Sequence, residues 1–358
     1  MTHTARLVVL ALSLAIAGGA CGRTVRMPIE QPAEIPIAQL WQEPADIETR
    51  DLFHGPGGPE LIPPAETFTF VERKTTGTNP GYDVRDAQGR LWSVKLGLEA
   101  QSEVAASRVL WALGFHQPPT YFVERWRMSG DEAGEQPGSR FRPELPGHTV
   151  VGEWSWYDNP FAGSGPFAAL VVVNMLLNNW DLKTPNNKIY DVTDAAGRGE
   201  RRYVVRDLGG SLGTSRQPAA LSWMPFMRVA QGSRNDLEGF QQQGFVKAID
   251  GDKVVFDYRG LDGGLVETVT VADLRWTCEL LSRLTERQWQ DAFRAAGYSP
   301  EQVNGYTTKV REKIAQAREL AARPGAAEGS GLRQHHPEAA RSRAHTEQTD
   351  AVHQAVRR

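Results

Sequence analysis

The chain has 358 residues, of which 40% are hydrophobic and 23% are charged, and these values are typical of a folded globular protein. Its length allows one large domain or two small ones. The formal net charge of -3 gives no reason to expect nucleic acid or an anionic membrane surface as a partner. The composition therefore excludes the strongly basic class of nucleic-acid-binding proteins.

Residues 1–21 have the layout of a signal peptide. Arg6 precedes an apolar run that is too short to be a permanent membrane anchor, and small residues lead up to Cys21. A cysteine directly after small residues resembles a bacterial lipobox, although Gly18 stands where an aliphatic residue is usual. We therefore expect an exported lipoprotein, held only by a lipid on Cys21 at the periplasmic or extracellular face of a membrane. Ordinary signal cleavage is the alternative.

Cysteine usage agrees with lipidation. Cys21 and Cys278 are the two cysteines, so a lipid on the first leaves the second without a disulfide partner. Cys278 falls in an apolar helical pattern, which favours a buried small hydrophobic residue over a nucleophile.

The first part of the globular chain is predicted to be a small antiparallel lobe. Residues 22–66 are rich in Pro, Glu and Gly without periodicity, so we expect a flexible tether there. Alternating apolar residues and turn signals predict a sheet and one helix within 67–126. The predicted strands are 68–74, 82–86, 90–95 and 120–126, and the predicted helix is 102–113, with Ser102 as its N-cap and Gly114 as its end.

The second part, 145–322, is predicted to be mainly helical, and a polar connecting loop at 127–144 leads into it. The apolar segment 167–177 predicts a central core helix. Residues 323–358 lack an apolar period, so we expect a disordered tail. The remaining predicted elements are strand hairpins at 187–192 with 202–206 and across 245–270, and helices at 271–284, at 286–296 with a Thr285-x-x-Gln288 capping box, and at 300–322.

The sequence Asp-Leu-Lys-Thr-Pro-Asn at 181–186 follows the predicted core helix and carries three groups suited to phosphoryl transfer. The Asp181 carboxylate can orient and deprotonate an attacking hydroxyl, and the Lys183 ammonium can neutralise the transferring phosphoryl group. The Asn186 side-chain oxygen can ligate Mg²⁺. Taken alone these residues could form a turn, so the interpretation depends on what surrounds them.

The order of the surrounding features resembles the protein-kinase-like superfamily over about residues 68–322. It runs strand, Gly-bearing turn, strand, strand with Lys, helix with Glu, apolar helix, Asp loop, hairpin and Asp-Leu-Gly. The resemblance implies an α+β, two-lobed fold with an antiparallel-sheet N-lobe and a mainly helical C-lobe. It also implies that ATP and Mg²⁺ bind between the lobes.

The resemblance assigns roles to individual residues. The implied nucleotide-binding residues are Gly77, Gly81, Lys95 and Glu103, with Glu99 as the second choice for the carboxylate that holds Lys95. The implied metal ligands are Asn186 and Asp207, and the implied catalytic residues are Asp181 as the base and Lys183.

Several departures separate the chain from ordinary Ser/Thr kinases. Asn179-Trp180 precedes Asp181, where those kinases have a His-Arg pair whose Arg clamps a phosphorylated activation loop. Leu208 replaces the Phe of Asp-Phe-Gly, and no Ala-Pro-Glu follows Asp207. The sequence is therefore similar to divergent members such as the HipA-type, secretory-pathway, spore-coat and lipid-kinase-like kinases, without control by loop phosphorylation.

We expect a monomeric phosphotransferase that acts on a hydroxyl of a protein or small molecule at the cell envelope. One alternative is a pseudokinase that binds a nucleotide or another ligand without turnover, and another is transfer of AMP instead of a phosphoryl group. A more distant alternative is a serine hydrolase, because residues 209–213 fit the Gly-x-Ser-x-Gly pattern around Ser211.

Overall fold

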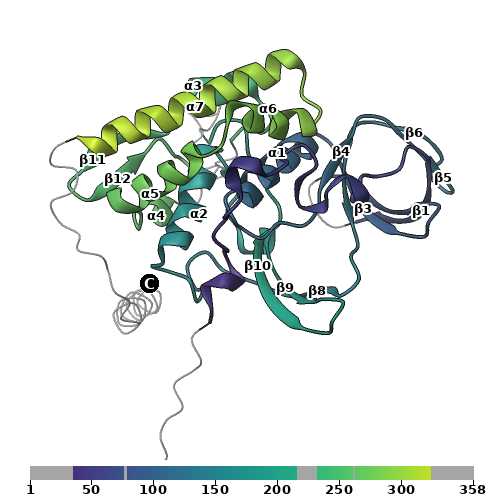
Figure 1. Ribbon diagram of the computed structural model, residues 1–358. Helices are drawn as coiled ribbons and strands as arrows, with labels where there is room; N and C mark the ends of the chain where they lie inside the picture. The colour runs from purple at the N-terminus through teal and green to yellow at the C-terminus, as the bar shows by residue number, and fades with distance from the viewer. Residues whose placement is uncertain (1–34, 76–78, 216–231, 261–262, 324–358) are drawn as a thin grey trace, which may run out of the picture. The chain divides into compact units, whose positions relative to one another are not determined.

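The computed structural model of the chain describes residues 35–75, 79–215, 232–260 and 263–323 (Figure 1). Apart from Ile35, these residues belong to one unit that begins at Pro36. The predicted signal peptide with Cys21, the turn residue Gly77 and the predicted tail beyond Arg323 lie outside the described residues.

The segment before the first strand differs from the flexible tether that we predicted for 22–66. Its described part buries Leu40, Ile47 and Leu52 in the same core as the helices. Trp41 adds a hydrogen bond from Nε1 to the Leu113 carbonyl oxygen at 2.7 Å. These apolar residues follow neither a helical nor a strand period, so the sequence pattern did not reveal that they are buried. The segment forms the short 3-10 helices η1 (Ile37–Gln39), η2 (Ile47–Thr49), η3 (Gly55–Gly57) and η4 (Pro59–Leu61).

A seven-stranded sheet forms the small lobe, in the order β4-β7-β3-β2-β1-β5-β6. Its neighbouring strands are antiparallel except for β1 and β5, which run parallel. The strands are β1 (Thr67–Lys74), β2 (Gly81–Arg85), β3 (Leu91–Leu96), β4 (Tyr121–Val123), β5 (Trp126–Ser129), β6 (Gly134–Gln136) and β7 (Ser139–Pro143).

The connecting loop predicted for 127–144 is wrong, because β5, β6 and β7 all belong to the small-lobe sheet. The side chains of β7 alternate between the two faces of the sheet. Phe141 lies on one face, in an aromatic core with Phe68, Trp92 and Trp126. Its neighbours in the strand are arginines, which point to the opposite face of the pleated sheet. The segment was predicted to be a loop because it is polar and rich in glycine around 129–139.

Helix α1 (Glu99–Ala112) contacts strands β3, β4 and β7 of the sheet and helix α6 (Glu286–Ala295) of the large lobe. It begins at Glu99, before the predicted start at 102, and Leu98 at its N-cap gives no side-chain hydrogen bond. Ser102 is therefore not a cap. Its hydroxyl donates to the Gly209 carbonyl oxygen at 2.9 Å, so it links the helix to the large lobe.

Helix α2 (Gly165–Leu176) is the central helix of the large lobe, as its apolar sequence predicted. Ser164 caps it by accepting a hydrogen bond from the Phe167 amide, and α4, α5 and α7 contact it. The capping box predicted at Thr285 is present at the start of α6. The other helices are η5 (Thr184–Asn186), α3 (Leu237–Gln242), α4 (Gly263–Val266), α5 (Val271–Ser282) and α7 (Pro300–Ala322).

Two small sheets complete the large lobe. The first has the order β10-β9-β8, and the second pairs β11 with β12. The hairpin predicted across 245–270 is shorter than expected, since it ends with β12 and α4 follows. The strands are β8 (His148–Glu153), β9 (Asn187–Thr193), β10 (Gly199–Val205), β11 (Val246–Asp250) and β12 (Lys253–Phe256). The predicted fold class is confirmed: an α+β chain with an antiparallel-rich small lobe and a mainly helical large lobe.

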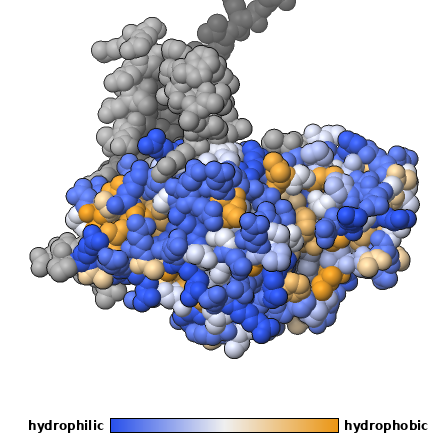
Figure 2. Space-filling model, turned by 90° about the horizontal axis from the view of Figure 1, so that it is seen from above, coloured by the Kyte–Doolittle hydropathy of each residue, from blue (hydrophilic) through white to orange (hydrophobic). Residues whose placement is uncertain are grey.

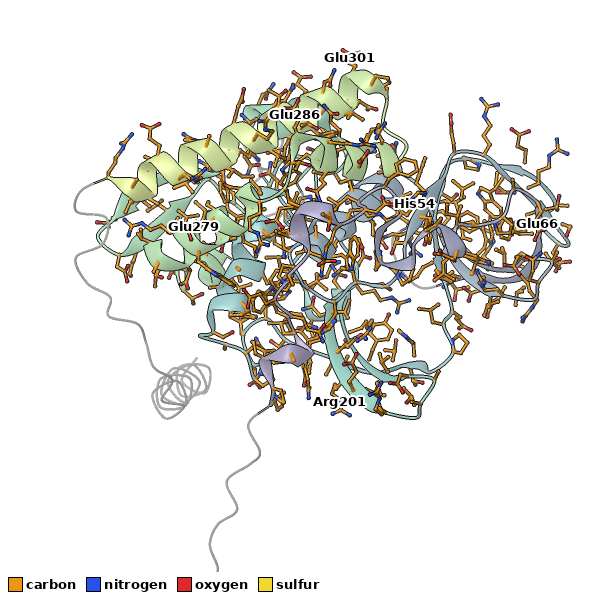
Figure 3. All side chains as sticks on the ribbon, in the orientation of Figure 1. His54, Glu66, Arg201, Glu279, Glu286 and Glu301 are labelled. Atoms are coloured by element: carbon orange, nitrogen blue, oxygen red, sulfur yellow. The ribbon has the colours of Figure 1, made fainter. Side chains whose placement is uncertain are left out.

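Charged side chains cover much of the surface. Arg201 on the β9–β10 hairpin and Glu301 at the start of α7 point away from the ribbon in Figure 3. The face shown in Figure 2 is mostly hydrophilic, with small hydrophobic areas. Within the described part of the chain, no helix is both long enough and apolar enough to cross a membrane.

Candidate active site

Lys95 is the centre of the charged cluster where the two lobes meet. It lies on β3, and its Nζ is 2.7 Å from Glu99 Oε2, 3.0 Å from Glu103 Oε2 and 2.9 Å from Asp207 Oδ1. Burial acts to lower the pKa of Lys95, but the three carboxylates outweigh it and raise the pKa above the usual value. Lys95 is therefore a fixed positive charge. Both carboxylates that we considered as its partner, Glu103 and Glu99, contact it.

Glu103 contacts two arginines in addition to Lys95. Its Oε1 accepts a hydrogen bond from Arg142 at 2.6 Å and lies 3.0 Å from Arg140 Nε. Burial acts to raise the pKa of Glu103, but Arg140, Lys95 and Arg142 outweigh it and lower the pKa to about 2. We did not predict the two arginines. Their i, i+2 spacing indicates only that they share one face of a strand, and it is the register of β7, with Arg140 opposite Lys95, that brings them to the lysine.

The predicted catalytic loop is closed by hydrogen bonds among its own residues. Lys183 Nζ lies 3.1 Å from Asp181 Oδ2. The Asn186 amide nitrogen donates to the Asp181 carbonyl oxygen at 2.7 Å and to Asp181 Oδ2 at 3.2 Å. The side-chain nitrogen of Asn186 is thus turned to Asp181, and no hydrogen bond from a described residue is found to its side-chain oxygen. The loop thus orients the Asp181 carboxylate and leaves an amide oxygen for a cation.

Asp207 is brought next to this loop by the backbone. The amides of Arg206 and Asp207 both donate to the Asn186 carbonyl oxygen, at 2.9 Å and 3.1 Å. Asp207 Oδ1 also accepts from the Gly209 amide at 3.1 Å, which fixes the direction of the carboxylate. The two predicted metal ligands, Asn186 and Asp207, therefore belong to neighbouring segments, and Asp207 contacts Lys95 from the other lobe.

Two glycines after Asp207 allow this close approach. A Cβ on Gly209 would lie 2.6 Å from the Glu99 Cβ, and a Cβ on Gly210 would lie 2.9 Å from the Asp181 Cβ. Distances below about 3 Å are not tolerated between such carbons, so both positions need glycine for a packing reason.

The predicted phosphate-binding glycines are only partly described. Gly77 lies outside the described residues. Gly81 lies in β2 opposite Lys95, and a Cβ there would be 2.7 Å from the Val94 carbonyl oxygen. The structure thus gives Gly81 a packing reason within the sheet, and its contact with nucleotide phosphates stays a prediction.

The amide and carboxylate at Asn186 and Asp207 suit a hard cation. Mg²⁺ prefers oxygen ligands and usually takes only one or two from the protein, with water and phosphate oxygens as the others. Within the described residues, no group of three or more His, Cys, Asp or Glu side chains gathers as a metal site. Asn186 and Asp207 could therefore supply two oxygen ligands to a Mg²⁺ ion.

The serine hydrolase alternative does not agree with the structure. Ser211 is completely buried, and residues 212–215 do not enter a helix. A nucleophilic serine needs an exposed hydroxyl at a strand-to-helix turn.

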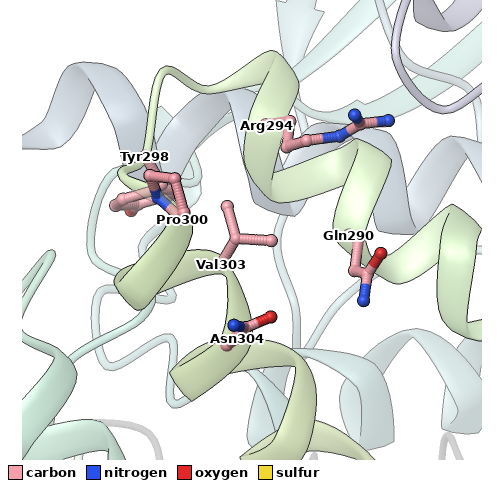
Figure 4. A pocket seen from close by; sticks show the side chains of 6 residues that line it. All are labelled: Gln290, Arg294, Tyr298, Pro300, Val303 and Asn304. Carbon is pink, nitrogen blue, oxygen red and sulfur yellow. The ribbon is translucent and has the colours of Figure 1, made fainter.

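A surface pocket of about 250 Å³ lies at α6 and α7, away from all the predicted site residues (Figure 4). It is lined by Gln290, Arg294, Tyr298, Pro300, Val303 and Asn304.

No profile of a known protein family matches the sequence, and comparison with curated proteins gives no match. Among solved structures, the chain is similar to the proinflammatory kinase CtkA of Helicobacter pylori, with 12% identity and a TM-score of 0.41 over 72% of this chain and 98% of that one. It is also similar to the Rio2 kinase of Chaetomium thermophilum, solved with ADP, Mg²⁺ and phosphoaspartate, with 13% identity and a TM-score of 0.32 over 70% of this chain and 72% of that one.

The two-lobed α+β arrangement of this chain is described from its own elements, and these likenesses add no chemistry to it. We therefore infer function only from the side-chain contacts around Lys95, Asp181 and Asp207.

Proposed function

We propose that the chain is an ATP- and Mg²⁺-dependent phosphotransferase that acts on an acceptor hydroxyl of a protein or small molecule. The observation that carries this proposal is the contact of Lys95 with Asp207 at 2.9 Å, across a separation of 112 residues in the sequence. Asp207 is tied in turn to Asn186, and Asn186 to Asp181. The residues that we propose as the cation for phosphates, the metal ligands and the base are thus joined by one chain of contacts, which supports the proposal.

Each group has a role in the proposed reaction. Asp181 accepts the proton of the acceptor hydroxyl, and the oxygen of that hydroxyl forms a bond to the γ-phosphorus of ATP. The bond between the γ-phosphorus and the oxygen that bridges it to the β-phosphorus breaks, and ADP leaves. Lys95 and Lys183 offset the negative charge of the phosphates. Asn186 and Asp207 would hold Mg²⁺, which neutralises the phosphate oxygens and orients them for in-line transfer.

Binding and transfer of labelled ATP by the full-length chain test this proposal. We expect Mg-ATP to raise the melting temperature and the γ-phosphate label to be retained on an acceptor. Asp181→Asn should abolish transfer and keep binding, whereas Asp207→Ala should lose the Mg²⁺-dependent part of binding. Asp191→Asn is the matched control, since Asp191 is an exposed carboxylate paired with Arg201 on the neighbouring hairpin.

The outcomes separate the alternatives. Binding without transfer to any acceptor favours the pseudokinase, and retention of the α-phosphate label favours transfer of AMP. No binding of Mg-ATP by the wild-type chain, or normal transfer by Asp181→Asn, contradicts the proposal.

We also propose that the chain is exported and attached to a membrane by a lipid on Cys21. The support is the signal-like sequence of residues 1–21. Growth with labelled palmitate should label the wild-type chain and the Cys278→Ser control but not Cys21→Ser. Equal labelling of the two variants contradicts lipidation at Cys21.

A further inference from the structure

Arg234 connects two parts of the candidate site that no local sequence pattern links. Its guanidinium forms an ion pair with Glu99 in the first turn of α1, 135 residues earlier in the chain. The same guanidinium lies over the ring of Trp180, with 5.1 Å between Cζ and the ring centroid. Trp180 directly precedes Asp181. Arg234 thus joins the helix that holds Lys95 to the loop that carries the predicted base.

The backbone around Arg234 is held on both sides. The Trp180 indole donates to the Ser233 carbonyl oxygen at 3.0 Å, and the Ser233 hydroxyl accepts from the Thr214 amide at 2.9 Å. On the other side, the Asn235 amide group donates to Gln101 Oε1 of α1 at 3.1 Å. Arg234 is therefore a fixed residue and not a mobile surface arginine, and its side chain is only 20% exposed.

Glu99 divides its two oxygens between the two cations. Oε2 lies 2.7 Å from Lys95 Nζ, and Oε1 pairs with Arg234. Because the side chain of Glu99 is 10% exposed, neither cation is readily replaced by water. Charge-assisted hydrogen bonds in such a place are stronger and more directional than those at the surface.

We propose that Arg234 is a positioning residue for nucleotide binding, which holds the start of α1, and through Glu99 the ammonium of Lys95, against the catalytic loop. This inference rests on the function proposed above. Trp180, the residue before the predicted base, stacks on Arg234, and Arg234 pairs with Glu99. The link between α1 and the predicted catalytic loop is therefore made by residues of the chain itself.

The test compares Mg-ATP affinity and amide hydrogen exchange in full-length variants. We expect Arg234→Gln to bind Mg-ATP about tenfold more weakly, because one charge-assisted link to α1 is lost, and to exchange faster at residues 99–103. Arg234→Lys keeps the charge but loses the planar stack on Trp180, so it should restore part of the affinity. Arg311→Gln is the control, since Arg311 forms an exposed ion pair with Glu286 in the same lobe.

A double-mutant cycle separates positioning from general stability. If Arg234 acts through Glu99, then Glu99→Gln with Arg234→Gln should bind Mg-ATP no more weakly than Glu99→Gln alone. Additive losses, or wild-type affinity and exchange in Arg234→Gln, overturn the inference. If Arg234→Gln does not fold, Arg234→Lys replaces it in the comparison of Mg-ATP affinity and hydrogen exchange with the wild-type chain.

Failure of the proposed function looks different from failure of this inference. A wild-type chain that binds no Mg-ATP contradicts the proposed function, and the exchange rates at residues 99–103 still decide whether Arg234 holds α1. Faster exchange in Arg234→Gln than in Arg311→Gln supports that role, and equal exchange overturns it.

Discussion

Replacing Glu103 by Gln tests the electrostatic design of the site, because the change keeps the size of the side chain and removes its charge. Glu103 is 1% exposed and contacts Lys95, Arg140 and Arg142. Removing one partner of a buried ionic cluster costs about 3–5 kcal/mol, since the other charges stay buried without compensation. The pKa of about 2, against an ordinary 4.5, gives a similar figure of about 3 kcal/mol. We expect Glu103→Gln to lower the free energy of unfolding by about 3 kcal/mol at neutral pH.

The lowered pKa of Glu103 also predicts how its contribution to the free energy of unfolding changes with pH. A carboxylate whose pKa is lowered by folding stabilises the protein fully above its unfolded pKa, near 4.5. That stabilisation is lost as the pH falls toward 2. Urea unfolding of the wild-type chain and Glu103→Gln should therefore show a gap that narrows below about pH 4.5. The control is Glu319→Gln, whose exposed carboxylate pairs with Arg323 and should change stability by about 0.5 kcal/mol or less. A gap below about 1 kcal/mol at neutral pH, or one that does not narrow in acid, would refute the reasoning.

Three further predictions use single contacts. Gly210→Ala should lower the rate of phosphoryl transfer at least tenfold with little loss of folded protein, because the new methyl group displaces Asp181. A rate within twofold of wild type in a transfer assay contradicts this prediction. Cys278 should not react with a thiol reagent at about pH 8 in the native Cys21→Ser variant, because burial raises its pKa to about 12, and it should react once the chain is unfolded in urea. Thr285→Ala should lower the free energy of unfolding by about 1 kcal/mol through loss of the α6 cap, whereas an unchanged urea midpoint would show that the cap contributes nothing.

Local features of the sequence predicted the parts of the fold that depend on short-range physics. The apolar run at 167–177 indicated the central helix, and the Thr285 capping box marked the start of α6. The spacing of Asp181, Lys183 and Asn186 predicted one loop, and in the structure Lys183 and Asn186 each contact Asp181. Their catalytic roles stay predictions.

The parts that the sequence did not reveal depend on contacts between distant residues. Arg140 and Arg142 were not among the predicted site residues; both are buried, and both pair with Glu103 of α1. Arg234 pairs with Glu99, which is 135 residues earlier, and no local pattern predicts such a pair. Patterns in a single sequence indicate periodicity and turns, so they do not predict which buried charged residues pair with residues far away in the chain.

The charge of the whole cluster constrains the ligand more than any one contact does. Its cations outnumber its carboxylates, and Asp181 and Lys183 cancel each other next to it. A surplus of buried positive charge is costly unless an anion compensates for it, so the site favours a polyanionic ligand such as a nucleotide polyphosphate. This holds equally for an enzyme and for a scaffold without turnover, because both would bind the polyphosphate. Asp181 would distinguish them, since binding does not require the proton transfer that we propose for it. The members of the cluster are Lys95, Arg140, Arg142, Arg206 and Arg234 against Glu99, Glu103 and Asp207.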